Sequence, residues 1–221
     1  MTVSPARIGS WLGRLMRCCH PEPVVAVTAL TALIAVIAGH SAGGVALVAG
    51  TIGMSQLSIG WANDAIDAGR DRHSGRDDKP LAAEWAGGRR TVAVASAIAA
   101  AVTIGMGLSA GLTAGLVVTA GLVGGHLYNW PLKSTAASIV PYLVSFGALP
   151  AFIVLAVPVP LPVPLIVAGA LFGGAAHLLN VQPDLADDAA TGIRGLPHRL
   201  GPERSRALAA LLVLLAAAAI I

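Results

Sequence analysis

Long apolar runs dominate this chain of 221 residues. Seven of them approach the roughly 20 residues that a helix needs to cross the hydrocarbon core of a bilayer. They cover residues 23–40, 43–62, 91–109, 111–127, 136–157, 161–179 and 205–221. Because lipid offers no partner for backbone N–H and C=O groups, such runs form helices. The pattern predicts an all-α fold, a polytopic membrane helical bundle with about seven transmembrane helices.

The charged residues support this prediction and give the bundle an orientation. Only 11% of the residues are charged, whereas soluble domains carry about 25%. All fourteen Lys and Arg residues lie before the first run or beside the connections that follow the second, fourth and sixth runs. With seven spans these zones share one membrane face, which the positive-inside rule makes cytoplasmic. We therefore predict a multi-pass protein of the cell membrane, with its N-terminus and both acidic loops in the cytoplasm.

The basic loops also explain the sequence pI of about 9.3. Lys and Arg that fix topology need no nucleic-acid partner, and we expect none. The partner that the composition requires is the lipid bilayer.

Oxygen-bearing side chains recur at four-residue intervals directly after the second and sixth runs. The first set is Asn63, Asp67 and Asp71, with Asp64 beside it, and the second is Asn180, Asp184 and Asp188. Residues four apart share one face of a helix, although Pro183 is a potential helix breaker in the second set. Solvated loop acids are the alternative interpretation, which the matched spacing disfavours.

Clustered carboxylates repel one another unless a cation neutralises them. Mg²⁺ typically takes one or two carboxylates and completes its shell with water and phosphate oxygens. Arg70 and Lys79 follow the first set and Arg194 follows the second, and such side chains suit phosphate contacts. The two sets therefore predict a site in which Mg²⁺ ions bridge a diphosphate.

Four sequence motifs resemble those of the UbiA superfamily of intramembrane prenyltransferases. They are Asn63-x-x-x-Asp67-x-x-x-Asp71, Arg76-Asp-Asp-Lys79-Pro80-Leu81, Tyr128-Asn-Trp-Pro-Leu-Lys133, and Asp184-x-x-x-Asp188 followed by Gly192, Leu196-Pro197 and Leu200-Gly201. The motifs occur in order, each after the expected apolar run, and the resemblance extends over nearly the whole chain.

The resemblance implies a helical bundle around a central cavity that binds an allylic prenyl diphosphate through Mg²⁺. The implied metal-site residues are Asn63, Asp67, Asp71, Asp184 and Asp188. The implied catalytic residues, which contact the diphosphate or close the site, are Lys133, Tyr128, Arg76 and Lys79. We place Asn63, Asp64, Arg70, Asn180 and Arg194 in contact with the substrate. The implied reaction ionises the diphosphate to an allylic carbocation, which then prenylates an aromatic or lipid-soluble acceptor.

Two other functions are compatible with parts of the pattern. A membrane terpene cyclase of the same superfamily would use the same metal site but let the cation attack its own chain. A divalent-cation transporter would need acidic residues at mid-membrane, whereas the acids here lie at one face.

The extent of the chain is a separate point. Family members usually have about nine spans, and this chain ends at Ile221 inside an apolar run. We therefore treat residues 1–221 as a single prenyltransferase-like domain that is shortened or C-terminally truncated. The sequence specifies neither the acceptor nor the prenyl chain length.

Overall fold

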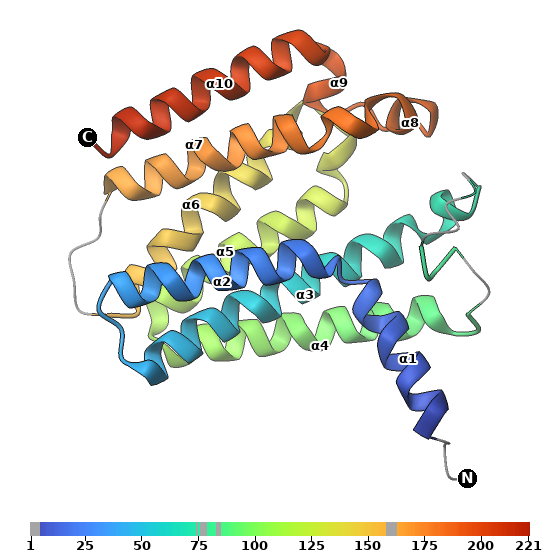
Figure 1. The fold of residues 1–221 in the computed structure, drawn as a ribbon, viewed down its shortest axis with the longest axis horizontal. Helices are drawn as coiled ribbons and strands as arrows, with labels where there is room; N and C mark the ends of the chain where they lie inside the picture. Colours follow the sequence, from blue (N-terminus) through green and yellow to red (C-terminus); the bar gives the residue numbers. More distant parts are fainter. Residues whose placement is uncertain (1–4, 74, 76–78, 83–84, 158–162) are drawn as a thin grey trace.

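The computed structural model describes residues 5–73, 75, 79–82, 85–157 and 163–221, and within these ranges its regular elements are all helical. Ten α-helices follow one another among the described residues, in the order shown in Figure 1. They are α1 (Pro5–Arg17), α2 (Pro21–Ile37), α3 (Ala42–His73), α4 (Gly88–Ser109), α5 (Leu112–Asn129), α6 (Val140–Leu155), α7 (Val163–Asn180), α8 (Leu185–Ala190), α9 (Leu196–Leu200) and α10 (Pro202–Ala219). Short 3-10 turns lie at Leu132–Ser134, Ala136–Ile139 and Gln182–Asp184. Each of the seven predicted apolar runs coincides with one long helix.

The protein is a polytopic membrane helical bundle, as predicted. In the part of the chain that the structure describes, four helical segments qualify as spans by length and hydropathy, namely those at 42–73, 88–109, 136–155 and 163–190. A fifth span results if residues 11–17 and α2, which meet at a bend of 69°, count as one broken span. The seven-span count and the cytoplasmic side of the loops stay predictions.

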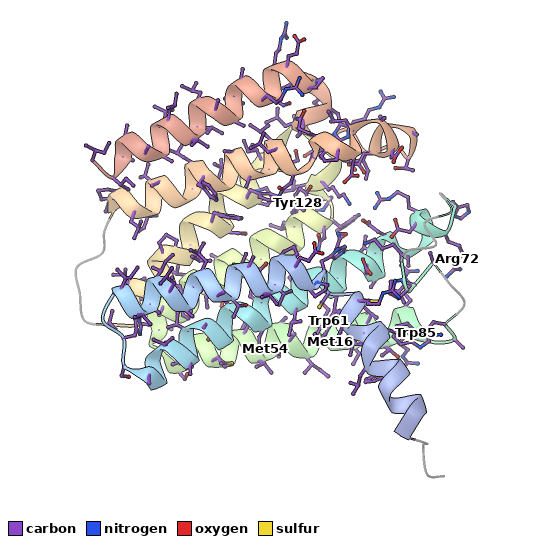
Figure 2. The ribbon with its side chains drawn as sticks, viewed as in Figure 1. Met16, Met54, Trp61, Arg72, Trp85 and Tyr128 are labelled. Carbon is purple, nitrogen blue, oxygen red and sulfur yellow. The ribbon has the colours of Figure 1, made fainter. Side chains whose placement is uncertain are left out.

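The surface of the bundle suits a lipid environment. Large apolar side chains point outward from several helices, including Val25 and Ile37 of α2 and Leu214 of α10, each at least 66% exposed. Nitrogen and oxygen atoms instead gather at the end of the bundle where α3, α5 and α7 end (Figure 2). Because an exposed apolar surface of this kind is costly in water, these flanks are the parts that face lipid.

Helices that follow one another in the chain mostly pack side by side. Helix α3 packs against α2 and α4, α5 against α4 and α6, and α7 against α6 and α10. Helix α3 has 32 residues and is therefore about 48 Å long, which exceeds the roughly 30 Å hydrocarbon core. Its last turns consequently extend beyond the apolar part of the bundle, and they carry the first acidic motif.

Small residues let α6 and α7 approach closely. A Cβ atom built on Gly169 of α7 would lie 2.7 Å from the backbone oxygen of Phe146 in α6. Backbone cannot yield as a flexible side chain can, so this position requires glycine. Gly105 of α4 differs, because a Cβ there would meet nothing within 4 Å.

These two glycines form a matched pair for a stability test. We expect Gly169→Ala to lower the free energy of unfolding by about 1–3 kcal/mol, the usual cost of overpacking. Gly105→Ala should be neutral or slightly stabilising, since alanine favours an unobstructed helix interior. Unfolding in detergent, followed by circular dichroism, measures both, and equal midpoints would contradict the close-packing argument.

Candidate functional site

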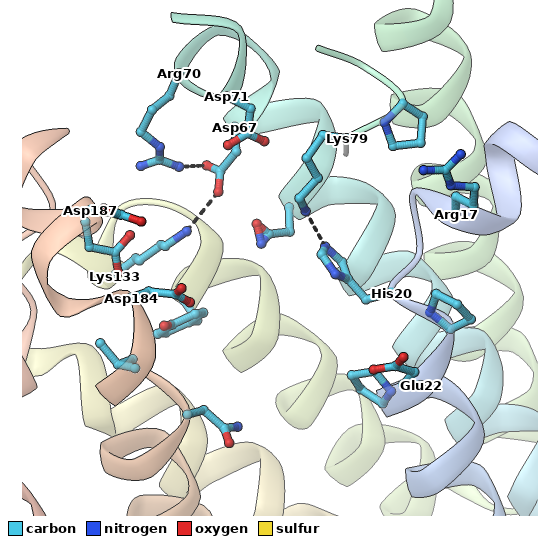
Figure 3. A pocket seen from close by; sticks show the side chains of 18 of the residues that line it. Arg17, His20, Glu22, Asp67, Arg70, Asp71, Lys79, Lys133, Asp184 and Asp187 are labelled. Atoms are coloured by element: carbon cyan, nitrogen blue, oxygen red, sulfur yellow. Dashed lines mark hydrogen bonds and ion pairs between the residues drawn. The ribbon is translucent and has the colours of Figure 1, made fainter. Parts of the chain in front are cut away.

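A polar cavity of about 600 Å³ opens at the end of the bundle where α3, α5 and α7 end (Figure 3). Ten of the residues predicted for the site line it. They are Asn63, Asp67, Arg70, Asp71, Lys79, Tyr128, Lys133, Asn180, Asp184 and Asp188. The cavity therefore gathers residues from segments that are more than 100 positions apart in the sequence.

The first acidic motif lies on uninterrupted helix. Because α3 continues to His73, Asn63, Asp67 and Asp71 share one face, and that face lines the cavity. Asp67 is the most strongly paired of the three. Its Oδ2 atom accepts a hydrogen bond of 2.8 Å from Lys133 Nζ, and its other oxygen pairs with Arg70. The two cations thus already neutralise a carboxylate at the centre of the cavity.

Asp64 is placed differently from its neighbours in the motif. It is only 2% exposed and is not among the residues that line the cavity. Its Oδ1 atom lies 2.9 Å from Lys79 Nζ and 3.0 Å from His20 Nε2. Asp64 therefore supports two residues of the cavity wall from behind.

The second acidic motif is not one continuous helix. Helix α7 ends at Asn180, a 3-10 turn covers Gln182–Asp184, and α8 begins at Leu185. The break falls at Pro183, the potential helix breaker noted in the sequence. Asn180, Asp184 and Asp188 nevertheless all line the cavity. The 3-10 turn therefore keeps the three side chains on one side, as an unbroken helix would.

Asp71 of α3 and Asp188 of α8 face the same cavity. Clustered carboxylates repel one another as anions, and a bound cation would relieve that repulsion.

The remaining two predicted site residues lie elsewhere. Arg194 is exposed and does not line the cavity, and its backbone oxygen accepts a hydrogen bond of 3.1 Å from Arg199 Nε. Arg76 lies outside the described residues. A substrate contact for either residue stays a prediction.

Several cavity residues were not selected from the sequence. Arg17, His20 and Glu22 line it from the junction of α1 and α2, and Asp187 lines it from α8. Tyr142 of α6 also lines it, and its ring meets that of Tyr128 edge-on at a centroid distance of 4.9 Å. The sequence offered two signals for these cavity residues. Glu22 is a single acid directly before the first apolar run, and Tyr142 is a single tyrosine near the start of the fifth run.

Two smaller cavities lie next to the polar one and share lining residues with it or with each other. Tyr128 and Tyr142 also border a second cavity, of about 130 Å³, which Gln56, Ile59 and Ser145 line as well. These last three residues in turn border a third cavity, of about 30 Å³, deeper among the helices. The tyrosine pair therefore stands between a charged compartment and an apolar one.

The chain belongs to the UbiA prenyltransferase family, because residues 24–221 match the sequence profile of that family. No curated protein matches the sequence significantly. Three similar solved structures have 16–17% sequence identity to this chain. At such low identity, the structural similarity establishes a shared fold only.

The first of these structures concerns digeranylgeranylglyceryl phosphate synthase, with a TM-score of 0.73 over 95% of this chain and 76% of the other. The second is a UbiA homologue from Archaeoglobus fulgidus bound to GPP and Mg²⁺, with a TM-score of 0.75 over 93% and 77%. The third is a UbiA homologue from the same organism bound to DMAPP and Mg²⁺, with a TM-score of 0.74 over 91% and 76%.

Proposed function

We propose that this protein transfers a prenyl group from an allylic prenyl diphosphate to an acceptor, in a reaction that depends on Mg²⁺. The observation that carries the proposal is the polar cavity, where two acid-rich segments and several cations line one space. Membership of the UbiA prenyltransferase family supports the general reaction. The A. fulgidus homologue with GPP and Mg²⁺ supports the class of donor and metal.

The donor set of the cavity fits Mg²⁺. Within the described residues no group of three His, Cys, Asp or Glu side chains is close enough to hold a metal ion by itself. Mg²⁺ does not need such a cage, because phosphate oxygens and waters complete its shell. Asp67 and Asp71 on one segment, and Asp184 and Asp188 on the other, would hold it. When bound, the metal would neutralise negative charge that builds up on the departing diphosphate.

The cations of the cavity would act on the same leaving group. Lys133 and Arg70 both contact Asp67, and Lys79 lies beside His20 on a neighbouring part of the wall. As the C–O bond to the diphosphate breaks, the electron pair leaves with its oxygen. Ammonium and guanidinium groups held there in advance stabilise that charge without reorganising.

The second and third cavities would hold the isoprenoid tail, with the reacting carbon near the tyrosine pair. The electron-rich ring faces of Tyr128 and Tyr142 can stabilise an allylic cation. His177 supports both rings, at centroid distances of 5.5 Å and 4.8 Å. An apolar surrounding also limits the access of water, which would quench the cation.

Metal dependence gives the direct test of this function. We expect the protein in detergent to bind geranyl diphosphate at least about tenfold more weakly in EDTA than with Mg²⁺, a difference of about 1.4 kcal/mol or more. Filter binding with labelled geranyl diphosphate measures it, and geraniol serves as the control that lacks phosphates. Equal affinity with and without Mg²⁺ would refute the metal-bridge mechanism and leave Arg70, Lys79 and Lys133 as the binding site.

A further inference from the structure

His20 occupies an unusual backbone position at the wall of the cavity. It joins α1 to α2 with φ 55° and ψ 73°, in the left-handed region. Among the described residues it alone combines a positive φ with a side chain, since the other such positions are glycines. Glycine adopts this conformation without strain, so the histidine is retained at a cost. Backbone strain of this kind is concentrated at functional sites.

Two charged neighbours hold the imidazole by its Nε2 atom. His20 Nε2 lies 3.0 Å from Asp64 Oδ1 and 3.1 Å from Lys79 Nζ, and Lys79 Nζ also donates a hydrogen bond of 2.9 Å to Asp64 Oδ1. Because a carboxylate only accepts and an ammonium group only donates, these contacts do not by themselves fix the tautomer. In the tautomer that donates Nε2–H to Asp64, the lone pair of the neutral ring is on Nδ1, which makes Nδ1 the basic atom.

The surrounding packing fixes where this base stands. Trp61 Nε1 of α3 donates a hydrogen bond of 2.8 Å to the backbone oxygen of Leu15 in α1. Cys18 and Cys19, directly before His20, are fully buried in the same cluster. The α1–α2 junction is therefore anchored on α3. The imidazole itself lines the cavity, with its side chain 40% exposed.

His20 lies beside Lys79 and across the cavity from Lys133 and Asp184. Figure 3 shows Arg17, His20 and Glu22 on one side and Lys133 with Asp184 on the other. We call the first group the N-terminal wall. A donor bound at Lys133 and Asp184 would leave the N-terminal wall for the second substrate.

We propose that the N-terminal wall binds a hydroxyl-bearing acceptor and that His20 removes the proton that this acceptor loses. The inference rests on the proposed function. The bond between the first prenyl carbon and the diphosphate oxygen breaks, and its electron pair leaves with the diphosphate. The nucleophilic atom of the acceptor forms a bond to that carbon, and the acceptor's proton moves to Nδ1 of His20. Asp64 holds the opposite nitrogen and stabilises the imidazolium that forms.

The test compares His20→Asn and His20→Gly with wild type in the full-length protein. Both replacements tolerate a positive φ, so folding should survive, and neither can accept the proton. Transfer from geranyl diphosphate to substituted phenols of graded acidity and to glycerol 1-phosphate should fall about a hundredfold, the lower end for a general base. Mg²⁺-dependent binding of geranyl diphosphate should change far less than transfer, because Lys79 keeps its hydrogen bond to Asp64. The loss should shrink for the more acidic phenols, because they need less help from a base.

Two controls separate this role from a structural one. His40→Asn removes a histidine at the other end of α2, where Nε2 lies 2.8 Å from the backbone oxygen of Ile153, and should leave transfer unchanged. Glu22→Gln removes the other carboxylate of the wall and should retain at least a tenth of the transfer rate.

The outcomes that overturn the proposal are distinct from failure of the proposed function. Unchanged transfer in His20→Asn, a loss independent of phenol acidity, or a larger loss in Glu22→Gln would each refute the role of His20. Normal binding of geranyl diphosphate by wild type, with no hydroxyl-bearing probe prenylated, would refute the acceptor class. No binding of geranyl diphosphate by folded wild type would instead refute the proposed function itself.

Discussion

Lys133→Ala is expected to lower the turnover of a prenyl diphosphate about a hundredfold, the order seen when one preorganised electrostatic contact is lost. Lys133 is 17% exposed, and its Nζ atom lies 2.8 Å from Asp67 Oδ2. It is therefore held in place within the cavity before any substrate arrives. A charge fixed in this way stabilises the departing diphosphate and does not have to reorganise during the reaction.

Substitution by arginine should restore only part of the activity. The guanidinium group is wider and planar, so it cannot occupy the position of a compact ammonium group. Arg204→Ala provides the matched control, because Arg204 is an exposed cation at the start of α10 and does not line the cavity. Turnover per folded protein, with folding checked by size-exclusion chromatography, gives the comparison. Unchanged turnover in Lys133→Ala would make Lys133 a topology residue and remove it from the site.

Much of the fold could be predicted from the sequence because lipid imposes a simple rule. An apolar run of sufficient length must be helical, and each of the seven runs coincides with a helix. The four-residue spacing of Asn63, Asp67 and Asp71 also translated directly into one helical face, because α3 continues through all three residues. In both cases a local pattern determines the structure with no tertiary information.

Other features depended on contacts between distant segments, which spacing does not show. Asp64 stands beside Asn63 in sequence, yet its side chain is buried against Lys79 and His20. His20 gave no periodic signal, since its position depends on a bend between two helices and on packing against α3. Tyr142 was concealed within an apolar run, where a single tyrosine has no evident partner. The positions of all three residues therefore depend on tertiary structure.

The burial of Asp64 leads to a second large effect, on stability rather than turnover. Asp64→Ala removes the carboxylate to which Lys79, itself 17% exposed, donates a hydrogen bond. Losing a hydrogen bond to a charged group costs about 1.5–3 kcal/mol, and Lys79 stays in contact with the polar cavity. The change would also release His20, whose strained backbone then lacks its side-chain anchor. We therefore expect Asp64→Ala to unfold at markedly lower denaturant concentration than wild type.

Asp71→Ala is the matched control, because Asp71 lies on the same helix but lines the cavity. Asp71→Ala should unfold at nearly the same denaturant concentration as wild type but lose Mg²⁺-dependent binding of geranyl diphosphate. A carboxylate with a purely structural role would show the opposite pattern. The double variant Asp64→Ala/Lys79→Met should regain part of the lost stability, since an apolar side chain removes the partly buried cation that has lost its partner. Unfolding monitored by tryptophan fluorescence in detergent compares all three proteins. Equal stability of wild type and Asp64→Ala would show that the buried pair contributes nothing, and Asp64 would return to the set of direct substrate contacts.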